Sequence, residues 1–578
     1  MLDNYWTRAL NRRVTRRRAL VLTGGFTASA AFLAACGGDD DEEPSGGGTT
    51  GGTTGGGTQP TDTGPSVGGH LVWQGYGDPG GGLELIKARN AGVNQMASLT
   101  HDSLLHFGYG LPEYSGTGND VIPSMAVALP EVSPDKLTVT FKIVEGATFH
   151  DGKPVTSEDF LWTYETLAFA EESAMKGDFS WLDSVEAPDA TTLVMQMNQV
   201  NADLLQTLAG KSLAGVLHRE HEESGAAENS FLGCGPYKFV EYAPPTLMKY
   251  ERNPDYWNKD KAGWFESIDR LGTSDSEKKV ADIISKQVHV TYWFPAEERD
   301  RITAQRDDVV VFKHPPAGSS TLYIRSDVAP FSDKRVRQAL SMGFDRQGLI
   351  EVLGDPDGEP DQALSVSGEA WEFRSPLDLP RADLYELNLA EAKKLLSAAN
   401  VSLPMKATLP TWNSTVIGQK HVDELTFIAT SLRSNGLLDA EILEETFGQF
   451  GPRFTGVYDS LKWGPNVTAT LPDLGIAIYR KYFWGGGTLE PPTFNESYVM
   501  NERVDQLVTD QLQEFDRTAR IALFRELEDI VSEEMYHIAG VTHTLNYMID
   551  PSVKNAQMPR DAYNGSTAWM KYWYFGEA

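Results

Sequence analysis

The sequence predicts an α/β protein with more than one domain, and three observations lead to this expectation. The chain has 578 residues, which is too long for one simple core and suggests two or three domains. Residues 137–143 alternate between apolar and polar side chains, as a half-buried strand does. Residues 501–530 carry apolar side chains at helical spacing, so the chain contains both strands and helices.

The stretch Leu137–Glu165 predicts a strand, a tight turn and a capped helix in succession. After the alternating strand, Asp151-Gly152 is a turn signal, because glycine accepts the positive φ that a sharp reversal needs. Thr156 can cap the first N–H groups of the following helix, and Asp159 stands where a capping box requires it. The stretch contains no nucleophile–base pair and no metal-ligand spacing, so we interpret it as scaffold.

Composition excludes several classes of function. The formal net charge is −31, which argues against nucleic acid as a partner, since phosphate binding needs Lys and Arg. Hydrophobic residues make up 40% of the chain, enough for a packed globular body. The two cysteines, Cys36 and Cys234, predict no disulfide framework and no Cys-based zinc site. We expect neither a cofactor nor a bound metal.

The N-terminus predicts export from the cytoplasm. An Arg-rich segment precedes an apolar run from Ala19 to Ala35, which is shorter than a comfortable membrane span. The run ends in Leu33-Ala34-Ala35-Cys36, which resembles the lipobox of bacterial lipoproteins and implies cleavage before Cys36 and lipidation of its thiol. The alternatives are a plain export signal with an incidental cysteine, or an uncleaved anchor. The arginines also hint at twin-arginine export.

Residues 37–68 predict a disordered tether. They are rich in Gly and Thr, carry five acidic residues near their start and have almost nothing apolar to bury. A tether directly after a lipid-anchored cysteine makes sense if the folded body works at the outer face of a membrane. We therefore expect an extracytoplasmic protein anchored to the cell membrane.

Five motifs occur in a characteristic order along the chain. The first is F-K-I-x-x-G-A-x-F-H-D-G-K-P-V-T-x-E-D-F, which begins at Phe141. The others are L-G-C-G-P-Y-K-F (232–239), R-N-P-D-Y-W (252–257), F-S-D-K-R-V-R-Q-A-L-S-M-G-F-D-R (331–346) and the helical stretch 501–530. These motifs, spread over most of residues 69–578, resemble in sequence and order those of one family, the family 5 extracellular solute-binding proteins of ABC transporters. Cys234 stands where that family usually has Thr.

The resemblance implies a periplasmic-binding fold of type II, in its large three-domain form with two hinged lobes. We expect lobe I to consist of residues 69–110, 229–316 and 546–578. Residues 111–228 would form an extra domain II, and residues 317–545 would form lobe III. The signal peptide would be residues 1–36 and the tether residues 37–68.

The resemblance also implies a function without catalysis. Such a protein captures a peptide-like or other small solute by closing two lobes around it, then delivers it to a membrane permease driven by an ATPase. We expect a monomer that is not an enzyme. The alternatives are a family member that binds an oligosaccharide or a nickel or other metal complex, and an extracytoplasmic hydrolase.

Candidate ligand contacts are aromatic and polar side chains near strand ends, because open α/β sheets bind ligands beyond the carboxyl ends of their strands. The candidates are Trp73, Tyr292, Trp293, Trp412, Asn413, Trp463, Asp473, Trp484 and Glu490. Taken singly, each aromatic residue fits the core better than a ligand contact. In peptide-binding relatives, a Trp matching Trp463 precedes an Asp-Pro-Asp-like motif that helps to hold the α-amino group of the ligand. Here Leu471 replaces the first Asp, so either Asp473 or Glu490 compensates or the ligand is a different solute.

Two further clusters have both a chemical and a structural interpretation. His218 and His221 share one helix face and could hold a metal, but a surface turn is the simpler interpretation. Cys234 lies beside two glycines, and packing explains it better than reactivity. The motifs of serine hydrolases, zinc proteases and P-loop proteins are absent from the sequence.

Overall fold

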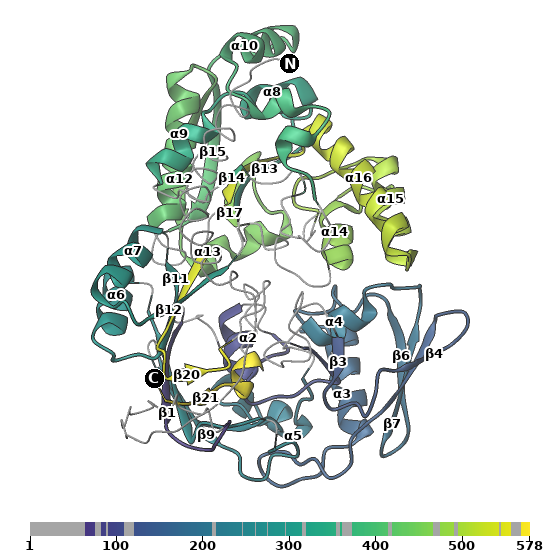
Figure 1. Ribbon diagram of the computed structural model, residues 1–578. Helices are drawn as coiled ribbons and strands as arrows, with labels where there is room; N and C mark the ends of the chain where they lie inside the picture. Colours follow the sequence, from purple (N-terminus) through teal and green to yellow (C-terminus); the bar gives the residue numbers. More distant parts are fainter. Residues whose placement is uncertain are drawn as a thin grey trace, which may run out of the picture. The chain divides into compact units, whose positions relative to one another are not determined.

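The largest sheet joins strands from three separate parts of the chain (Figure 1). Its order is β12-β19-β11-β1-β10-β9-β8, and β1 runs parallel to both of its neighbours, β10 and β11. The strands are β1 (His70–Gly75), β8 (Tyr237–Ala243), β9 (Leu247–Arg252), β10 (Ser267–Gly272), β11 (Val290–Phe294), β12 (Val310–His314) and β19 (Leu545–Ile549). This computed structural model describes residues 64–75, 82–87, 91–108, 121–210, 215–244, 247–260, 262–273, 275–294, 296–314, 319–353, 359–360, 364, 373–413, 419–465, 474–489, 495–542, 545–556 and 568–577.

Smaller sheets use the remaining described strands. One contains β4 (Glu131–Val132), β5 (Thr138–Lys142), β7 (Thr192–Met197) and β6 (Leu182–Asp189), in that order. Another contains β14 (Glu359–Pro360), β18 (His537–Thr542), β13 (Ser319–Ile324) and β17 (Leu461–Pro465). The pairs are β15 (Met405–Trp412) with β16 (Leu438–Glu445), β2 (Leu105–Phe107) with β3 (Val121–Pro123), and β20 (Val553–Lys554) with β21 (Tyr574–Phe575).

Helices accompany every part of the described chain. They are α2 (Ala91–Ala97), α3 (Ser157–Phe169), α4 (Leu204–Gly210), α5 (Arg219–Glu223), α6 (Ser276–Ile284), α7 (Ala296–Gln305), α8 (Lys334–Ser341), α9 (Arg346–Val352), α10 (Leu389–Ala398), α12 (Gln419–Ser434), α13 (Phe447–Phe450), α14 (Leu474–Tyr482), α15 (Glu502–Gln513) and α16 (Arg517–Glu534). Short 3₁₀ turns cover 226–228, 376–378, 382–385, 451–455 and 568–572. The mixture of helices with sheets confirms the expected α/β class.

The predicted strand, turn and capped helix are all present. In β5, the side chains of Val139 and Phe141 are fully buried, as the alternation indicated. Gly152 has φ +91°, so the turn does use the left-handed conformation that favours glycine. Thr156 and Asp159 form the predicted capping box at the start of α3.

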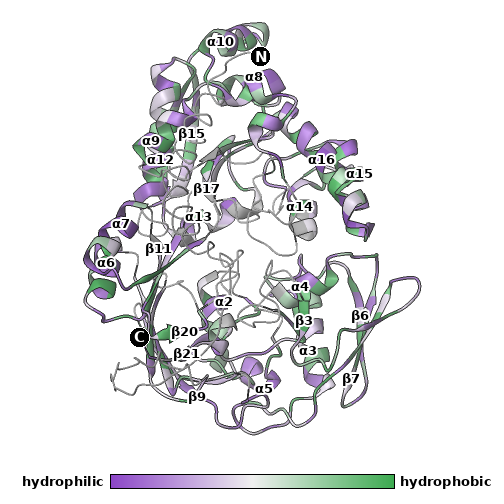
Figure 2. Cartoon of the chain, in the orientation of Figure 1, coloured by the Kyte–Doolittle hydropathy of each residue, from purple (hydrophilic) through white to green (hydrophobic). Residues whose placement is uncertain are grey.

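The C-terminal helical stretch is split into two capped helices, α15 and α16. Asn501 and Asp516 each accept backbone hydrogen bonds at the helix starts. Both helices alternate hydrophobic with hydrophilic residues along their length (Figure 2). Phe515 fits the helical spacing seen in residues 501–530, but α15 ends at Gln513, and the Phe515 side chain is 50% exposed. Lys136 Nζ lies 3.8 Å from the centre of its ring.

Apolar side chains cover both faces of the seven-stranded sheet. On one face, Leu71, Trp73 and Tyr292 belong to the largest core cluster. On the other face, Val280 of α6 and Ile302 of α7 pack in a smaller cluster. Helices α6 and α7 lie together beside β11 (Figure 1). The position of α6 matters below, because its first turn lies near the carboxyl ends of the parallel strands.

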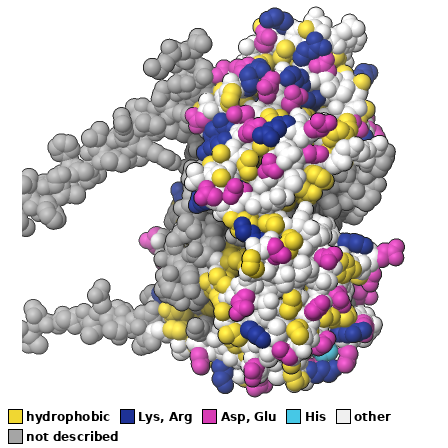
Figure 3. Space-filling view, turned by 90° about the vertical axis from the view of Figure 1, so that its right-hand side faces the viewer, with side chains coloured by type: hydrophobic (Ala, Val, Ile, Leu, Met, Phe, Trp, Pro, Cys, Tyr) yellow, Lys and Arg dark blue, Asp and Glu magenta, His cyan; other side chains and the backbone are white. Residues whose placement is uncertain are grey.

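All described residues belong to one unit, Gly64–Ala578. The boundaries of the lobes within it stay a prediction. None of the described helices is long and apolar enough to cross a membrane. On the face shown in Figure 3, acidic and basic side chains are interspersed rather than segregated by sign.

Candidate functional site

Two predicted contact residues, Trp73 and Tyr292, meet on one face of the seven-stranded sheet. Their rings are stacked, with centroids 6.3 Å apart and planes 14° apart. Tyr292 also stacks on Tyr547 of β19 at 5.1 Å, and its hydroxyl lies 2.9 Å from Gln95 Oε1 of α2. Trp73 and Tyr292 are each 2% exposed. They therefore form a rigid aromatic row near the carboxyl ends of β1 and β11.

Two buried cations lie against this aromatic row. Arg270 of β10 pairs in register with Trp73, and its Cζ lies 5.8 Å from the Trp73 ring centre. Lys279 of α6 has its Nζ 5.9 Å from the ring centre of Tyr292. Burial, and then the charge of Arg270, lower the pKa of Lys279 to about 8.

Sequence reasoning missed both cations, although one signal was available. Arg270 follows Ile268 at a spacing of two in β10, so it occupies the buried face of that strand. A charged residue on the buried face of a predicted strand is unusual and points to a specific partner. Lys279 carries no comparable signal, because a Lys in the first turns of a helix is ordinary.

A second group of predicted residues lies around β15 and β17. Trp463 of β17 is fully buried, and its ring centre lies 6.1 Å from that of His421. His421 lies 2.7 Å from Ser320 Oγ and 3.0 Å from Thr411 Oγ1, so it connects β13 with β15. Within the described residues, the Trp463 indole N–H has no hydrogen-bond acceptor.

The end of β15 carries two more predicted residues. Trp412 is 9% exposed and packs edge-on against Phe450, with ring centroids 5.4 Å apart. The Asn413 N–H donates to the carbonyl of Glu445 at 2.9 Å. Trp412 and Trp463 thus come from two strands that contact each other, β15 and β17.

The other predicted residues are less closely grouped. Trp484 is half-buried in the turn after α14, where its indole N–H donates to the Gly487 carbonyl. The backbone of Trp293 lies in β11. Cys36, Asp473 and Glu490 lie outside the described residues.

The ambiguous clusters have structural roles in the described chain. His218 is buried at the start of α5, and its Nε2 lies 3.2 Å from Asp151 Oδ2. Cys234 is buried, and burial raises the pKa of its thiol, which makes it unreactive. His150 Nε2 lies 3.0 Å from the carbonyl of Gly235. No group of three or more His, Cys, Asp or Glu among the described residues could hold a metal.

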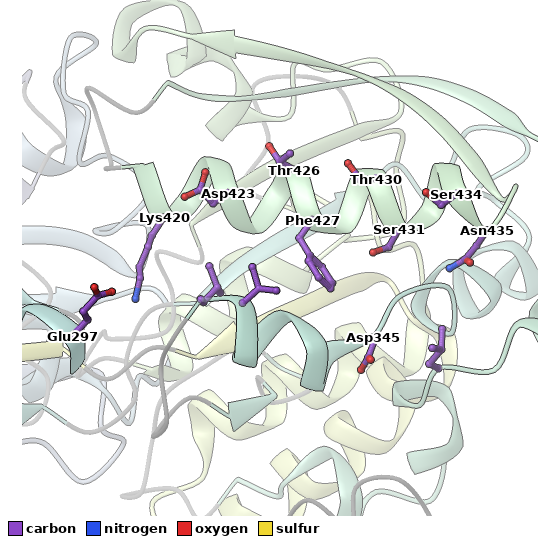
Figure 4. Close-up of a pocket in the computed structure, with 13 residues that line it drawn as sticks. Glu297, Asp345, Lys420, Asp423, Thr426, Phe427, Thr430, Ser431, Ser434 and Asn435 are labelled. Carbon is purple, nitrogen blue, oxygen red and sulfur yellow. The ribbon is translucent and has the colours of Figure 1, made fainter.

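A surface groove of about 740 Å³ lies along one side of α12 (Figure 4). Phe427 and Ser431 project from the same side of α12, and Thr430 also lines the groove. The groove contains none of the predicted contact residues. We therefore do not place the functional site there.

A buried ion pair connects two distant parts of the chain, the segment before α4 and the helices α14 to α16. Asp203 Oδ1 lies 2.6 Å from Arg520 Nη1, and the Gly475 N–H donates to Asp203 Oδ2 at 2.6 Å. The carboxylate thus meets the N-terminus of α14, where the helix dipole favours negative charge. A Cβ at Gly475 would lie 2.0 Å from Arg520 Nη2, so only glycine allows this approach.

Comparison with known proteins gives a consistent result. The family model described as "Bacterial extracellular solute-binding proteins, family 5 Middle" matches residues 120–503. A Brucella ovis protein, named provisionally as an ABC transporter peptide-binding protein, is 25% identical over 354 residues. That match covers 59% of this chain and 62% of the Brucella ovis protein, so this chain spans less than two thirds of the length of that relative.

Solved structures show the same fold over most of the chain. The binding protein AgaA of A. tumefaciens R10, in complex with agropinic acid, has a TM-score of 0.75 at 19% identity. That comparison covers 88% of this chain and 99% of AgaA. The oligopeptide-binding protein AppA of Bacillus subtilis, in complex with a nonapeptide, has a TM-score of 0.73 at 18% identity. The comparison with AppA covers 89% of this chain and all of AppA. The expected periplasmic-binding fold of type II is confirmed.

Proposed function

Because this chain belongs to family 5 of the bacterial extracellular solute-binding proteins, we propose that it is the solute-capturing component of an ABC importer. Lobe I would be built on the seven-stranded sheet, and lobe III on the sheet that contains β13, β17 and β18. Domain II would be built on the sheet that contains β5 to β7. The solute would bind between lobes I and III and be enclosed when they close.

One observation carries this proposal: the chain passes between the two main sheets twice, at neighbouring positions of those sheets. Residues 315–318 separate β12 from β13, and residues 543–544 separate β18 from β19. Strands β12 and β19 are paired in the first sheet, and β13 and β18 are paired in the second. Both crossings therefore join neighbouring strands in each sheet, which is the arrangement a two-stranded hinge requires.

We propose a peptide-like solute as the ligand. The Bacillus subtilis relative was solved with a nonapeptide and the A. tumefaciens relative with agropinic acid. Both are organic solutes, and pockets for such ligands are lined mainly by apolar and aromatic side chains. Among the candidate aromatic residues, the half-buried Trp484 and the 9% exposed Trp412 would take part in such a lining. An oligosaccharide or a metal complex has no specific support among the described residues.

Anchoring and delivery complete the proposal. Lipidation at Cys36 and the tether of residues 37–68 would hold the protein at the outer face of the membrane. The closed form would then dock on the permease, and the protein would not change the solute chemically.

A thermal-shift screen against tripeptides, oligosaccharides and metal chelates tests this function. A ligand present at 100 times its Kd stabilises the folded state by about 2.7 kcal/mol, which is easily detected. We expect tripeptides to raise the Tm and to be recovered unchanged by mass spectrometry. Consumption of a substrate without any rise in Tm would instead indicate a hydrolase and refute the proposal.

A further inference from the structure

Lys279 is a buried cation without a counter-ion in the described structure. Lys279 is only 7% exposed, and no carboxylate of the described residues forms an ion pair with it. Asp282, three residues further along the same helix, is already engaged: its Oδ2 accepts from Lys278 Nζ at 2.6 Å and from Gln74 Nε2 at 2.7 Å.

Two other buried lysines of the described chain, Lys462 and Lys571, do have such a partner. Lys462 pairs with Glu496, and Lys571 Nζ lies 3.0 Å from Asp102 Oδ1. At Lys279 the positive charge of Arg270 lowers the pKa further after burial. A buried ammonium is costly unless an anion accompanies it, so Lys279 is the cation here whose charge lacks compensation among the described residues.

The location of this pair suits a ligand. Strands β10, β1 and β11 are parallel neighbours, so their carboxyl ends lie at the same edge, where open α/β sheets bind ligands. Lys279 belongs to α6, which begins directly after β10, and Gly75 ends β1 beside the Arg270 guanidinium. The stacked rings of Trp73 and Tyr292 form the apolar wall behind the two cations.

We propose that Lys279 and Arg270 bind a carboxylate group of the transported solute. A carboxylate has two oxygens, so it can accept charge-assisted hydrogen bonds from the ammonium and from the planar guanidinium together. It would supply the counter-ion that Lys279 lacks among the described residues, while the rings of Trp73 and Tyr292 support the two cations from behind. The net charge of the chain is −31, so a local cationic pocket is what an anionic solute needs here.

This inference rests on the proposed function and narrows it to solutes that carry a carboxylate. The carboxylate could be the C-terminus of a peptide or belong to a small organic acid. The two sources share the chemistry that the site recognises, and the experiment separates them.

The test compares Lys279→Met with Lys278→Met, a matched control on the same helix. Both changes remove one positive charge, but the Lys278 side chain is 54% exposed and paired with Asp282. The probes are a mixture of tripeptides with free C-termini and the same mixture with C-terminal amides, with binding measured by native mass spectrometry. We expect wild type and Lys278→Met to bind the acids at least ~10-fold more tightly than the amides, and Lys279→Met to lose this preference.

Lys279→Gln gives the same comparison with a polar side chain in case Met disturbs folding. Equal binding of acids and amides by wild type, or an unchanged preference in both Lys279 variants, would overturn the inference while leaving the importer function intact.

If neither peptide mixture binds, the peptide part of the proposed function fails, and the anion site is then tested by itself. Thermal unfolding is followed in succinate and citrate against chloride at equal ionic strength. A rise in Tm in wild type and Lys278→Met, but not in Lys279→Met, supports a site for small organic acids. No rise in wild type overturns the carboxylate site as well.

Discussion

Lys571 and Lys279 are both buried lysines, but their surroundings differ in one respect. Lys571 has the carboxylate of Asp102 at 3.0 Å, whereas Lys279 has the guanidinium of Arg270 as its charged neighbour. Burial tends to lower the pKa of each, but Asp102 reverses the effect at Lys571, whose pKa is raised. At Lys279 the pKa falls to about 8.

The difference separates a structural charge from a functional one. Asp102 is also 2.6 Å from the Tyr256 hydroxyl and 3.0 Å from His106 Nε2, so its network ties the C-terminal 3₁₀ turn to the segments around β2 and Tyr256. Such a network is complete without a ligand. The charge of Lys279 gains its partner only when something else binds, which is a reason to keep it at the expense of stability.

The largest expected effect is from Asp102→Asn. Removing the carboxylate leaves Lys571 buried without a counter-ion, and breaking a buried pair in this way costs about 3–5 kcal/mol. We expect the free energy of unfolding to fall by that amount in urea denaturation. A loss below ~1 kcal/mol would show that the network contributes little to stability.

Asp203→Asn should have the next largest effect, because it removes the anion that holds Arg520 and the N-terminus of α14. The expected loss is about 3 kcal/mol, since the Arg520 guanidinium stays buried. The same variant tests closure: if the pair forms between moving lobes, the ligand-free protein should become more open in small-angle X-ray scattering. Unchanged stability and unchanged scattering would contradict both roles.

Lys279→Met should act in the opposite direction and stabilise the ligand-free protein. Replacing an uncompensated buried charge with an apolar side chain of similar length should raise the free energy of unfolding by about 1–3 kcal/mol. Urea denaturation of the ligand-free protein measures it. Destabilisation instead would mean that the Lys279 ammonium already has a stabilising partner.

The effect of Lys279 on stability should depend on pH. Its pKa in the folded state is about 8, below the ordinary value of 10.5, so the unfolded chain binds more protons between these two pH values. Stability contributed by this residue therefore rises with pH across that window, and the full cost is present below it. We expect the advantage of Lys279→Met to shrink between pH 8 and pH 10.5, as measured by denaturation at each pH. A constant difference would show that the pKa of Lys279 is normal.

The smallest effect is expected for Glu526→Gln, which removes an exposed ion pair between α15 and α16. Arg503 Nε lies 2.6 Å from Glu526 Oε1, but both side chains are nearly half exposed. Solvent weakens such pairs, so the loss should be about 0.2–1 kcal/mol. If Glu526→Gln lowered the free energy of unfolding as much as Asp203→Asn, burial would not explain how much an ion pair on these helices contributes to stability.

Local patterns predicted the local structure well, because they depend on residues that are close in sequence. The capping box of Thr156 and Asp159 and the buried face of β5 follow from neighbours a few positions apart. The spacing of Phe515 fits a helix, whereas α15 ends before it and Asp516 starts a new one. Five motifs in order were also enough to identify the family.

The candidate site was predicted only in part. The aromatic residues Trp73 and Tyr292 were chosen singly, and nothing in the sequence indicated that they stack on each other. That contact exists because β1 lies between β10 and β11, an order that brings together residues far apart in the chain.

The sequence by itself therefore determined the secondary structure around Leu137–Glu165, the family and the expected export of the chain. Only the tertiary structure placed Arg270 and Lys279 on the same aromatic row and left Lys279 without a carboxylate among the described residues. The physical reason is that periodicity records which face of an element is buried, whereas the balance of charge in a buried place depends on every element packed around it.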